Sequence, residues 1–292
     1  MERKGFIGGS DIASVMGLSR WKSALQLWAE KTGQLEPADL SDVEYVQLGS
    51  ELEDFIAKKF QRETDLKVRR ASKHYQHALY PYMRCQVDRI IERSEDLLEC
   101  KTCSAWKAKE WEGEDVPQEY ILQVMWQLGI TGRKVGWIAV LIGGQRFRYK
   151  KILFDEKLFD SIVECAKTFW GMVQTNTPPY ATGLDNPTIV KLNPYHNDSI
   201  EEVNDINDSV RYLQEVKMHI DDLKKEKDAL EAKIKQRIGG NLGVSTGNYI
   251  VTWKHQLRNS VDTTALKADG LYERYSKSSE TRVLRIKKDG AK

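Results

Sequence analysis

An acid and a base stand two residues apart in the apolar segment LLECKT, residues 97–102. Side chains of a β-strand alternate between its two faces, so Glu99 and Lys101 share one face and Cys100 takes the other. The simplest interpretation is a surface ion pair on an edge strand, which contributes only about 0–1 kcal/mol to stability. A catalytic interpretation requires further chemical groups on the same face.

The preceding segment supplies a second acid. MRCQVDRII (83–91) and DLLECKT (96–102) predict a β-hairpin with a tight turn centred on Ser94 and Glu95. That turn would pair Asp88 directly with Lys101 and place both on the same face as Glu99. A turn of odd length would separate these side chains, so the grouping depends on the turn.

Two acids and a lysine on one face suggest two kinds of chemistry. Carboxylates ~5 Å apart repel by about 3 kcal/mol at an effective dielectric constant of ~20, so a cation must offset them. Lys101 alone would complete a neutralised structural network. A hard divalent ion such as Mg2+ is the functional alternative, and the backbone carbonyl of Cys100 is then a candidate ligand. Lys101 would help to orient a water molecule or stabilise charge on a phosphate.

Two other segments offer a third acid and a buried amide. In the helix predicted over residues 43–60, Glu53 and Glu51 flank opposite rims of the apolar arc, and amphipathicity does not choose between them. That arc comprises Tyr45, Leu48, Leu52, Phe55, Ile56 and Phe60. Gln123 lies among apolar residues in YILQVMWQL, where its amide needs partners from the backbone or from the site.

Cys100 and Cys103 form a C-x-x-C motif, which raises the possibility of a zinc site. No second motif of this kind follows, and residues three apart on a strand point to opposite faces. The sequence therefore favours reduced thiols over a metal-thiolate site or a disulfide.

The composition, with 292 residues of which 40% are hydrophobic and 30% charged, fits one or two soluble domains. No apolar run approaches the ~18 residues of a membrane helix. The N-terminal MERKGFIGGSD has no apolar stretch behind its basic start, so we expect no secretory signal and a cytoplasmic location. The net charge is +2, so nucleic-acid contacts would come from local patches such as 67–74 and 146–151. In the second patch, a solvated strand face is the alternative.

The first 175 or so residues alternate helical and extended patterns. We expect helices over 22–33, 42–63, 117–132 and 155–174, with Gly33 ending the first, and a short helix capped by Ser10. Extended segments lie between them, near 66–71, 83–91, 96–102, 135–144 and 147–154. This order predicts an α/β (α+β) fold with a central mixed sheet flanked by helices.

A shift to Pro, Asn, Thr and Gly at 176–188 predicts a domain boundary, giving domains 1–185 and 186–292. The second would contain a long helix at about 199–238 and then a strand-helix-strand unit. Apolar residues keep a heptad spacing in that helix, broken by Lys227 and ended by Gly239 and Gly240. They are Leu213, Val216, Ile220, Leu223, Leu230 and Ile234. An antiparallel pair, a short coiled coil and a helix packed on its own domain all fit this pattern.

Asp88 followed by Glu99-Cys100-Lys101 resembles the D-(x)n-E-x-K signature of restriction-endonuclease-like, PD-(D/E)XK nucleases. The flanking motifs are more specific. IGGSDIASVMGLSRWKSALQLWAEKTG, LGSELE, QVDRII, LLECKT and YILQVMWQLGITG occur in the order seen in YqaJ-like viral recombinases, a family that groups with phage lambda exonuclease. The resemblance spans residues 3 to about 175.

The resemblance implies roles for individual residues. The family's Gly-x-x-x-Glu step falls on Gly49 and Glu53, which selects Glu53 over Glu51. By the same resemblance, Ser10 and Arg3 would hold the 5′-phosphate of the trimmed strand. The metal ligands would be Glu53, Asp88, Glu99 and the Cys100 carbonyl, with Lys101 as the catalytic lysine and Gln123 as its positioning partner. Two Mg2+ ions per active site are implied, with Mn2+ as a possible substitute.

The implied activity is Mg2+-dependent 5′ to 3′ digestion of double-stranded DNA, leaving 3′ single-stranded overhangs for recombination. A homo-oligomeric ring (trimer or tetramer), a phage single-strand annealing protein as partner, and a phage or prophage origin in a bacterial host are also implied. An endonuclease on the same core and a catalytically silent DNA-binding scaffold are the alternatives. The sequence departs from the family at Val87, Arg89 and Leu48, where Pro, Gly and Trp are frequent; none of the three supplies a ligand.

Overall fold

The computed structural model describes residues 3–280 and 282–287. For Arg3 it describes the backbone but not the side chain. The chain divides into two compact units, Met1–Asn193 and Pro194–Lys292. In the part of the chain that is described, no helix is long and apolar enough to cross a membrane.

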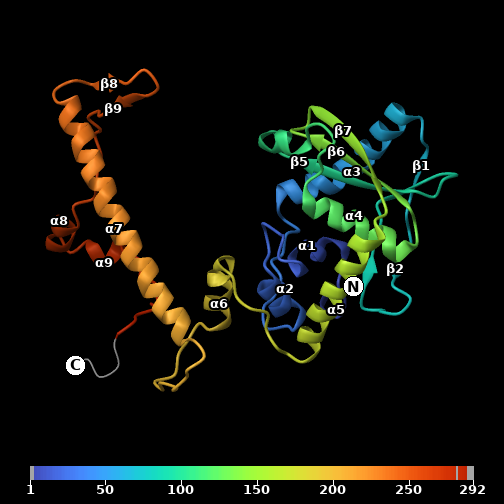
Figure 1. Ribbon diagram of the computed structural model, residues 1–292, viewed down its shortest axis with the longest axis horizontal. Helices are drawn as coiled ribbons and strands as arrows, with labels where there is room; N and C mark the ends of the chain where they lie inside the picture. Colours follow the sequence, from blue (N-terminus) through green and yellow to red (C-terminus); the bar gives the residue numbers. More distant parts are fainter. Residues whose placement is uncertain (1–2, 281, 288–292) are drawn as a thin grey trace. The chain divides into compact units, whose positions relative to one another are not determined.

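The first unit contains the helices that the sequence predicts, and local signals set their ends (Figure 1). The Ser23 hydroxyl accepts a hydrogen bond from the backbone N–H of Gln26 and begins α2, while Gly33, at φ 76°, follows its last turn. Asp155 caps α5 in the same way. The helices are η1 (Arg3–Gly5), η2 (Gly9–Asp11), α1 (Ile12–Val15), α2 (Ala24–Lys31), α3 (Glu44–Thr64), η3 (Ala105–Trp111), α4 (Gln118–Thr131), α5 (Glu156–Gln174), η4 (Gly183–Asp185) and α6 (Asn186–Leu192).

A five-stranded mixed sheet forms the centre of this unit, in the order β1-β4-β5-β6-β7. Strands β5 and β6 are parallel and the other neighbours are antiparallel. The strands are β1 (Val68–Arg70), β4 (Arg89–Ile91), β5 (Leu97–Cys103), β6 (Val135–Ile142) and β7 (Arg146–Leu153), and a separate two-stranded sheet pairs β2 (Tyr75–Gln76) with β3 (Arg84–Cys85). The predicted fold class, a mixed sheet flanked by helices, is confirmed.

Helices cover both faces of the sheet. On one face, Ile56 and Phe60 of α3 pack against Leu98 of β5. On the other face, Val124 and Leu128 of α4 pack against Leu97. Because side chains alternate along a strand, the odd-numbered residues of β5, like Leu97, point toward α4. The even-numbered residues, like Leu98, point toward α3.

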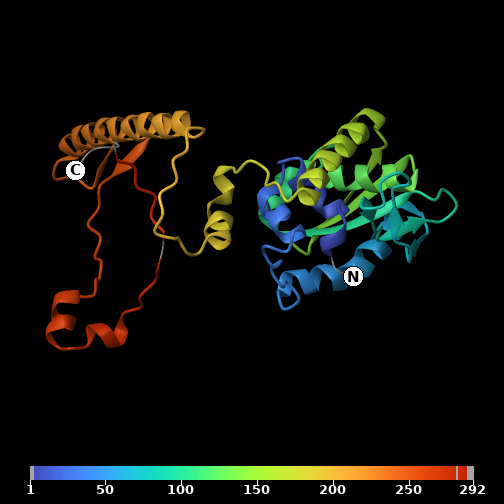
Figure 2. The ribbon, with the colours of Figure 1, turned by 90° about the horizontal axis from the view of Figure 1, so that it is seen from below.

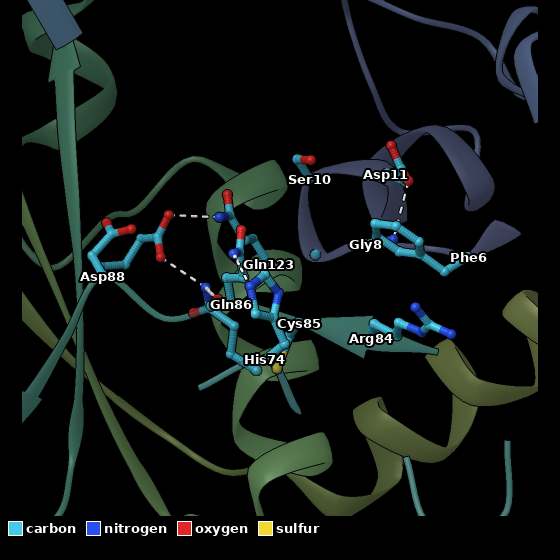
Figure 3. A pocket seen from close by; sticks show the side chains of 13 residues that line it. Phe6, Gly8, Ser10, Asp11, His74, Arg84, Cys85, Gln86, Asp88 and Gln123 are labelled. Atoms are coloured by element: carbon cyan, nitrogen blue, oxygen red, sulfur yellow. Dashed lines mark hydrogen bonds between the residues drawn. The ribbon is translucent and has the colours of Figure 1, made fainter. Parts of the chain in front are cut away.

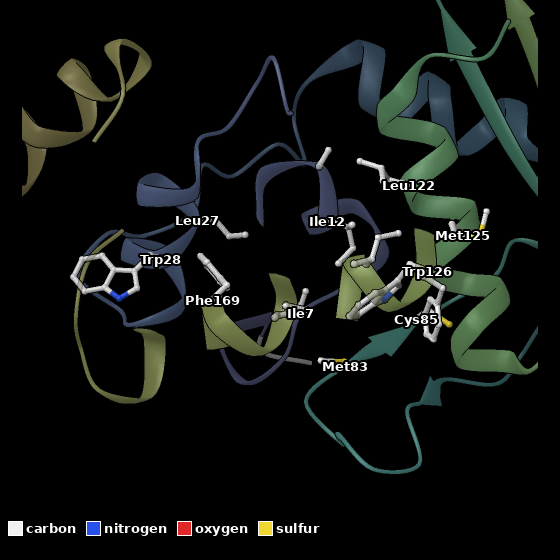
Figure 4. Close-up of a cluster of buried hydrophobic side chains, with 14 of the residues drawn as sticks. Ile7, Ile12, Leu27, Trp28, Met83, Cys85, Leu122, Met125, Trp126 and Phe169 are labelled. Atoms are coloured by element: carbon white, nitrogen blue, oxygen red, sulfur yellow. The ribbon is translucent and has the colours of Figure 1, made fainter. Parts of the chain in front are cut away.

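A larger apolar cluster joins the N-terminal helices to α4 and α5. Ile7, Ile12, Leu27, Trp126 and Phe169 are among its buried members (Figure 4). Helices α4 and α5 approach closely because residue 129 is glycine: a Cβ there would lie 2.1 Å from the Phe159 ring. This cluster fixes the η2–α1 segment against the helix that carries Gln123.

The β4–β5 hairpin forms with a different register from the predicted one. Arg89 pairs with Leu98 and Ile90 with Leu97, so extending the ladder sets Asp88 opposite Glu99 and not opposite Lys101. The turn centres one residue earlier, because Arg93 and Glu95 adopt left-handed conformations with φ 71° and 60°. The register differs by two residues, so the predicted face of each side chain is preserved.

Two further local predictions are corrected. Ser10 lies inside η2 and Gly8 is its N-cap, since the Asp11 carboxylate accepts from the Gly8 N–H at 3.0 Å. The apolar arc of α3 is buried only in part: Tyr45 and Phe55 are 71% and 46% exposed, while Ile56 is 1% exposed. The apolar cluster beneath α3 begins at Leu52, although Gly49 already lies close to Thr102 of β5.

The boundary between the units lies slightly later than the 185/186 division suggested by composition. Asp185 is fully buried and accepts hydrogen bonds from Ser23 and Thr182. Thr188 of α6 is also buried. These contacts attach η4 and α6 to the first unit.

The second unit contains α7 (Asn207–Ile238), an uninterrupted helix followed by a β8–β9 hairpin (Figure 2). Strands β8 (Gly243–Ser245) and β9 (Ile250–Thr252) pair with each other, and α8 (Thr263–Ala268) and α9 (Tyr272–Tyr275) follow. The predicted strand-helix-strand unit is wrong in its second strand: residues 282–287 form no strand, and Lys288 lies outside the described residues. The β9 partner is instead β8, which the sequence analysis missed.

Candidate active site

Strand β5 presents Glu99 to helix α4. The Glu99 carboxylate is 3% exposed and accepts from Gln123 Nε2 at 2.5 Å and Gln127 Nε2 at 2.7 Å. Gln123 and Gln127 lie one turn apart on α4, so their amides reach the same carboxylate. Gln127 Nε2 also donates to the Gln86 carbonyl at 2.9 Å. The α4 helix therefore holds Glu99 in one orientation.

Lys101 lies beside Glu99, as strand alternation predicts. Its Nζ is 2.6 Å from Glu99 Oε1 and 5.4 Å from the centre of the Tyr120 ring. Burial lowers the pKa of Lys101, but the Glu99 carboxylate outweighs burial, and the resulting pKa lies above its usual value. Lys101 is thus a cation at neutral pH and cannot act as a general base without first losing a proton.

Asp88 is the second acid of the site. Its Oδ2 accepts from the backbone N–H of Cys100 at 2.8 Å. Burial, together with repulsion from Glu99, raises the pKa of Asp88 to about 7. The two carboxylates interact strongly, and Lys101 offsets their charge only in part. A further cation at this position would stabilise the ionised form of Asp88.

Glu53 is close enough to raise the pKa of Asp88 but is engaged by Arg89. The Arg89 side chain, only 4% exposed, pairs with Glu53 and contacts Asp54 at 2.6 Å. It also donates to the Asp88 carbonyl at 2.8 Å. Arg89 pairs with Leu98 across the ladder and so lies on the α3 face, opposite to Asp88 and Glu99.

The donor set fits a hard divalent cation in part. Asp88, Glu99 and the Cys100 carbonyl supply oxygen donors of the type that Mg2+ prefers. Within the described residues, only one Asp88 oxygen accepts a hydrogen bond, which leaves Oδ1 available as a ligand. However, no three His, Cys, Asp or Glu side chains in these residues already form a metal site. Glu53 would have to leave Arg89 to complete the predicted set.

A cavity of about 580 Å³ opens beside these residues. Figure 3 shows Asp88 at one end, Phe6 and Arg84 toward the other, and Gln123, Gln86 and His74 between them. Ser10 lines the same cavity, so the structure brings it together with Asp88, Glu99 and Gln123. The side chain of Arg3, the predicted partner of Ser10, lies outside the described residues.

Three residues near the site were missed by the sequence analysis. Gln127 binds Glu99 from the next turn after Gln123, and the i, i+4 spacing of two glutamines on a predicted helix could have revealed it. Arg84 and His74 line the cavity from strand β3 and from the loop before strand β2, and no local pattern links either residue to Asp88.

Comparisons with known proteins agree with the motif order. The model of the YqaJ-like viral recombinase domain matches residues 1–134. A relative from Bacillus subtilis strain 168, the uncharacterized protein YqaJ, is 34% identical over 296 residues, covering 98% of this chain and 92% of the relative. The chain belongs to the YqaJ-like viral recombinase family.

Solved structures share the fold of this family member. An alkaline exonuclease from Laribacter hongkongensis, LHK-Exo, matches with a TM-score of 0.52 and 20% identity, over 60% of this chain and 91% of that one. The same enzyme in complex with dAMP gives a TM-score of 0.51 and 21% identity, with the same coverage. At this identity, the likeness establishes the shared mixed α/β fold.

Proposed function

We propose that this protein is a divalent-metal-dependent nuclease that degrades double-stranded DNA from its 5′ ends and leaves 3′ single-stranded overhangs. The observation that carries the proposal is the pairing of two buried, interacting carboxylates, Asp88 and Glu99, with the ammonium of Lys101 at one end of a cavity. Family membership in the YqaJ-like viral recombinases supports a role on DNA.

Each residue of the site has a distinct task in phosphodiester hydrolysis. Asp88, Glu99 and the Cys100 carbonyl would hold the cation, with Glu53 joining them on release from Arg89. When bound, Mg2+ or Mn2+ supplies positive charge that favours deprotonation of water and offsets charge on the phosphate. Lys101, protonated because of Glu99, is suited to stabilise the additional negative charge that develops in the transition state. Gln123 and Gln127 keep Glu99 oriented.

Exonuclease activity is favoured over endonuclease activity by the neighbours and by the cavity. LHK-Exo is an alkaline exonuclease and was crystallised with dAMP, a single nucleotide. In this chain, the cavity continues past Asp88 to Ser10, where a terminal nucleotide and its 5′-phosphate would lie. A pocket that receives one terminal nucleotide would favour a strand end over an internal segment.

The test is digestion of three DNA substrates in Mg2+: a linear duplex with 5′-phosphates, the same duplex with 5′-hydroxyls, and a covalently closed circle. We expect the phosphorylated duplex to be shortened from its 5′ ends, the hydroxyl form to be shortened more slowly, and the circle to stay intact. Cutting of the circle would replace the proposal by an endonuclease. Inertness toward all three would leave Glu99 and Lys101 as a structural ion pair.

The remaining expectations from the family also belong to this proposal. They are a homo-oligomeric ring (trimer or tetramer) around duplex DNA, a phage single-strand annealing protein as partner, two ions per site, and action in the cytoplasm of a bacterial host. A ring would keep a chain of net charge +2 on its substrate by topology. The molecular mass in solution, with and without duplex DNA, tests the ring.

A further inference from the structure

Helix α7 of the second unit carries an apolar face that is open to solvent. Ile220, Leu223, Leu230 and Ile234 recur with heptad spacing and are 45%, 63%, 55% and 44% exposed. Two charged residues occupy the other core positions of this repeat up to residue 237: Lys227 lies between Leu223 and Leu230, and Arg237 lies after Ile234. Leu213 and Val216, one to two turns earlier, are partly covered. The open part of the face therefore begins near Ile220 and runs toward the end of the helix.

We propose that this face binds the same face of a second copy of the chain, as an antiparallel two-helix coiled coil over residues 220–237. The inference goes beyond the proposed function and does not depend on it. In this alignment Leu223 of one copy packs against Ile234 of the other, and each Lys227 lies beside a Leu230. At each end of the pair, Ile220 packs against the aliphatic part of Arg237. The aliphatic part of Lys227 covers the leucine while its ammonium extends to solvent.

The charges beside the apolar face select this alignment. Glu226 of each copy lies next to Lys233 of the other, and Lys224 lies next to Glu231. The two-fold symmetry of the pair makes each contact occur twice, so all four flanking pairs join opposite charges.

Other alignments bring like charges together. Sliding the antiparallel pair by one heptad in one direction sets Glu226 against Glu226 and Lys224 against Lys224. Sliding it in the other direction sets Glu231 against Glu231 and Lys233 against Lys233. A parallel pair sets Glu226 against Glu231 and stacks both Lys227 side chains in one core layer. Charge complementarity thus distinguishes one arrangement from its neighbours.

Glu226 and Lys233 provide the sharpest test, because neither takes part in an ion pair within the described residues. Lys224 and Glu231, in contrast, have partners on their own helix. Changing Glu226 to Lys should therefore report on the contact between copies rather than on the stability of α7 itself.

The experiment measures self-association of the full chain by sedimentation equilibrium at low salt, for wild type, Glu226→Lys, Lys233→Glu and the double variant. Each single variant should weaken association roughly tenfold, since two attractive pairs become repulsive, and the double variant should restore it. Glu215→Lys, on the outer face of α7, is the matched control and should behave as wild type. Circular dichroism verifies that helix content is equal throughout.

Any self-association through the first unit is the same in all of these proteins. Differences in association constant between the variants therefore report on contacts of α7. Equal association of the wild type and both single variants would overturn the proposal. Tighter association of Glu226→Lys would also overturn it, because a parallel pair places Glu226 beside Glu231. Failure of the double variant to recover would refute the contact between Glu226 and Lys233.

Discussion

The pH dependence of metal binding follows directly from the environment of Asp88. Burial and the neighbouring Glu99 raise the pKa of Asp88 to about 7, so this carboxyl is protonated in acid and ionised in mild alkali. Only the ionised form is a good ligand for a hard cation. Affinity for the cation should therefore rise with pH and level off above neutrality.

The size of the effect can be worked out for a single required deprotonation. With a pKa of about 7, the fraction of ionised Asp88 falls by roughly thirty-fold between pH 8 and pH 5.5, and the apparent Kd weakens by the same factor. Below the pKa, log Kd changes by about one unit per pH unit.

Isothermal titration calorimetry with Mn2+ between pH 5.5 and 8 measures this slope. Glu95→Gln is the control, because Arg69 lowers the pKa of Glu95, which then stays ionised over the whole range. The control should reproduce the wild-type slope. A Kd that is constant from pH 5.5 to 8 would refute the assignment of Asp88 as a ligand that must lose its proton.

Three further predictions concern single residues. The raised pKa of Asp88 contributes stability at low pH that is lost as the pH rises through about 7. In EDTA, Asp88→Asn should therefore stabilise the protein by roughly 2–4 kcal/mol at pH 8 and by much less at pH 5. Equal thermal denaturation of wild type and variant at pH 8 would contradict this. Arg89→Met should tighten Mn2+ binding because it releases Glu53. Arg70→Met is the control and should leave Mn2+ binding unchanged, because Arg70 contacts Asp54. An unchanged Kd for Arg89→Met would show that Glu53 is not a ligand. Lys101→Met should reduce turnover by ~10²–10³-fold with duplex binding retained, as seen in a gel-shift assay, and near-normal turnover would remove Lys101 from the chemistry.

Strand alternation and helix periodicity correctly predicted where some of the candidate side chains lie. The apolar strand 97–102 placed Glu99 and Lys101 on one face, and the structure confirms both the face and the contact. The helix containing Gln123 was predicted from its apolar residues. Gln123 donates to Glu99, whereas the family resemblance implied Lys101 as its partner. These features follow from the local periodicity of apolar residues, which can be read from the sequence alone.

Other features depend on contacts that local patterns do not specify. The hairpin register was wrong because Arg93 and Glu95 adopt left-handed conformations without the glycine or asparagine that usually indicates them. The pairing of Arg89 with Glu53 joins a strand to a helix far earlier in the chain. The choice of Glu53 over Glu51 came from family resemblance and remains a prediction, because Glu53 now contacts Arg89 and no metal site is preformed among the described residues.

Digestion of a linear, 5′-phosphorylated duplex by wild type and by Lys101→Ala, in Mg2+ and in EDTA, tests most directly whether Asp88, Glu99 and Lys101 form a nuclease site. We expect the wild type to shorten each strand progressively from its 5′ end in Mg2+ only, and we expect no digestion by Lys101→Ala. Lys157→Ala, which removes an exposed lysine on helix α5 outside both basic patches, should digest DNA as wild type does. Equal digestion by wild type and Lys101→Ala, or digestion in EDTA, would contradict a metal-dependent nuclease site at Asp88, Glu99 and Lys101.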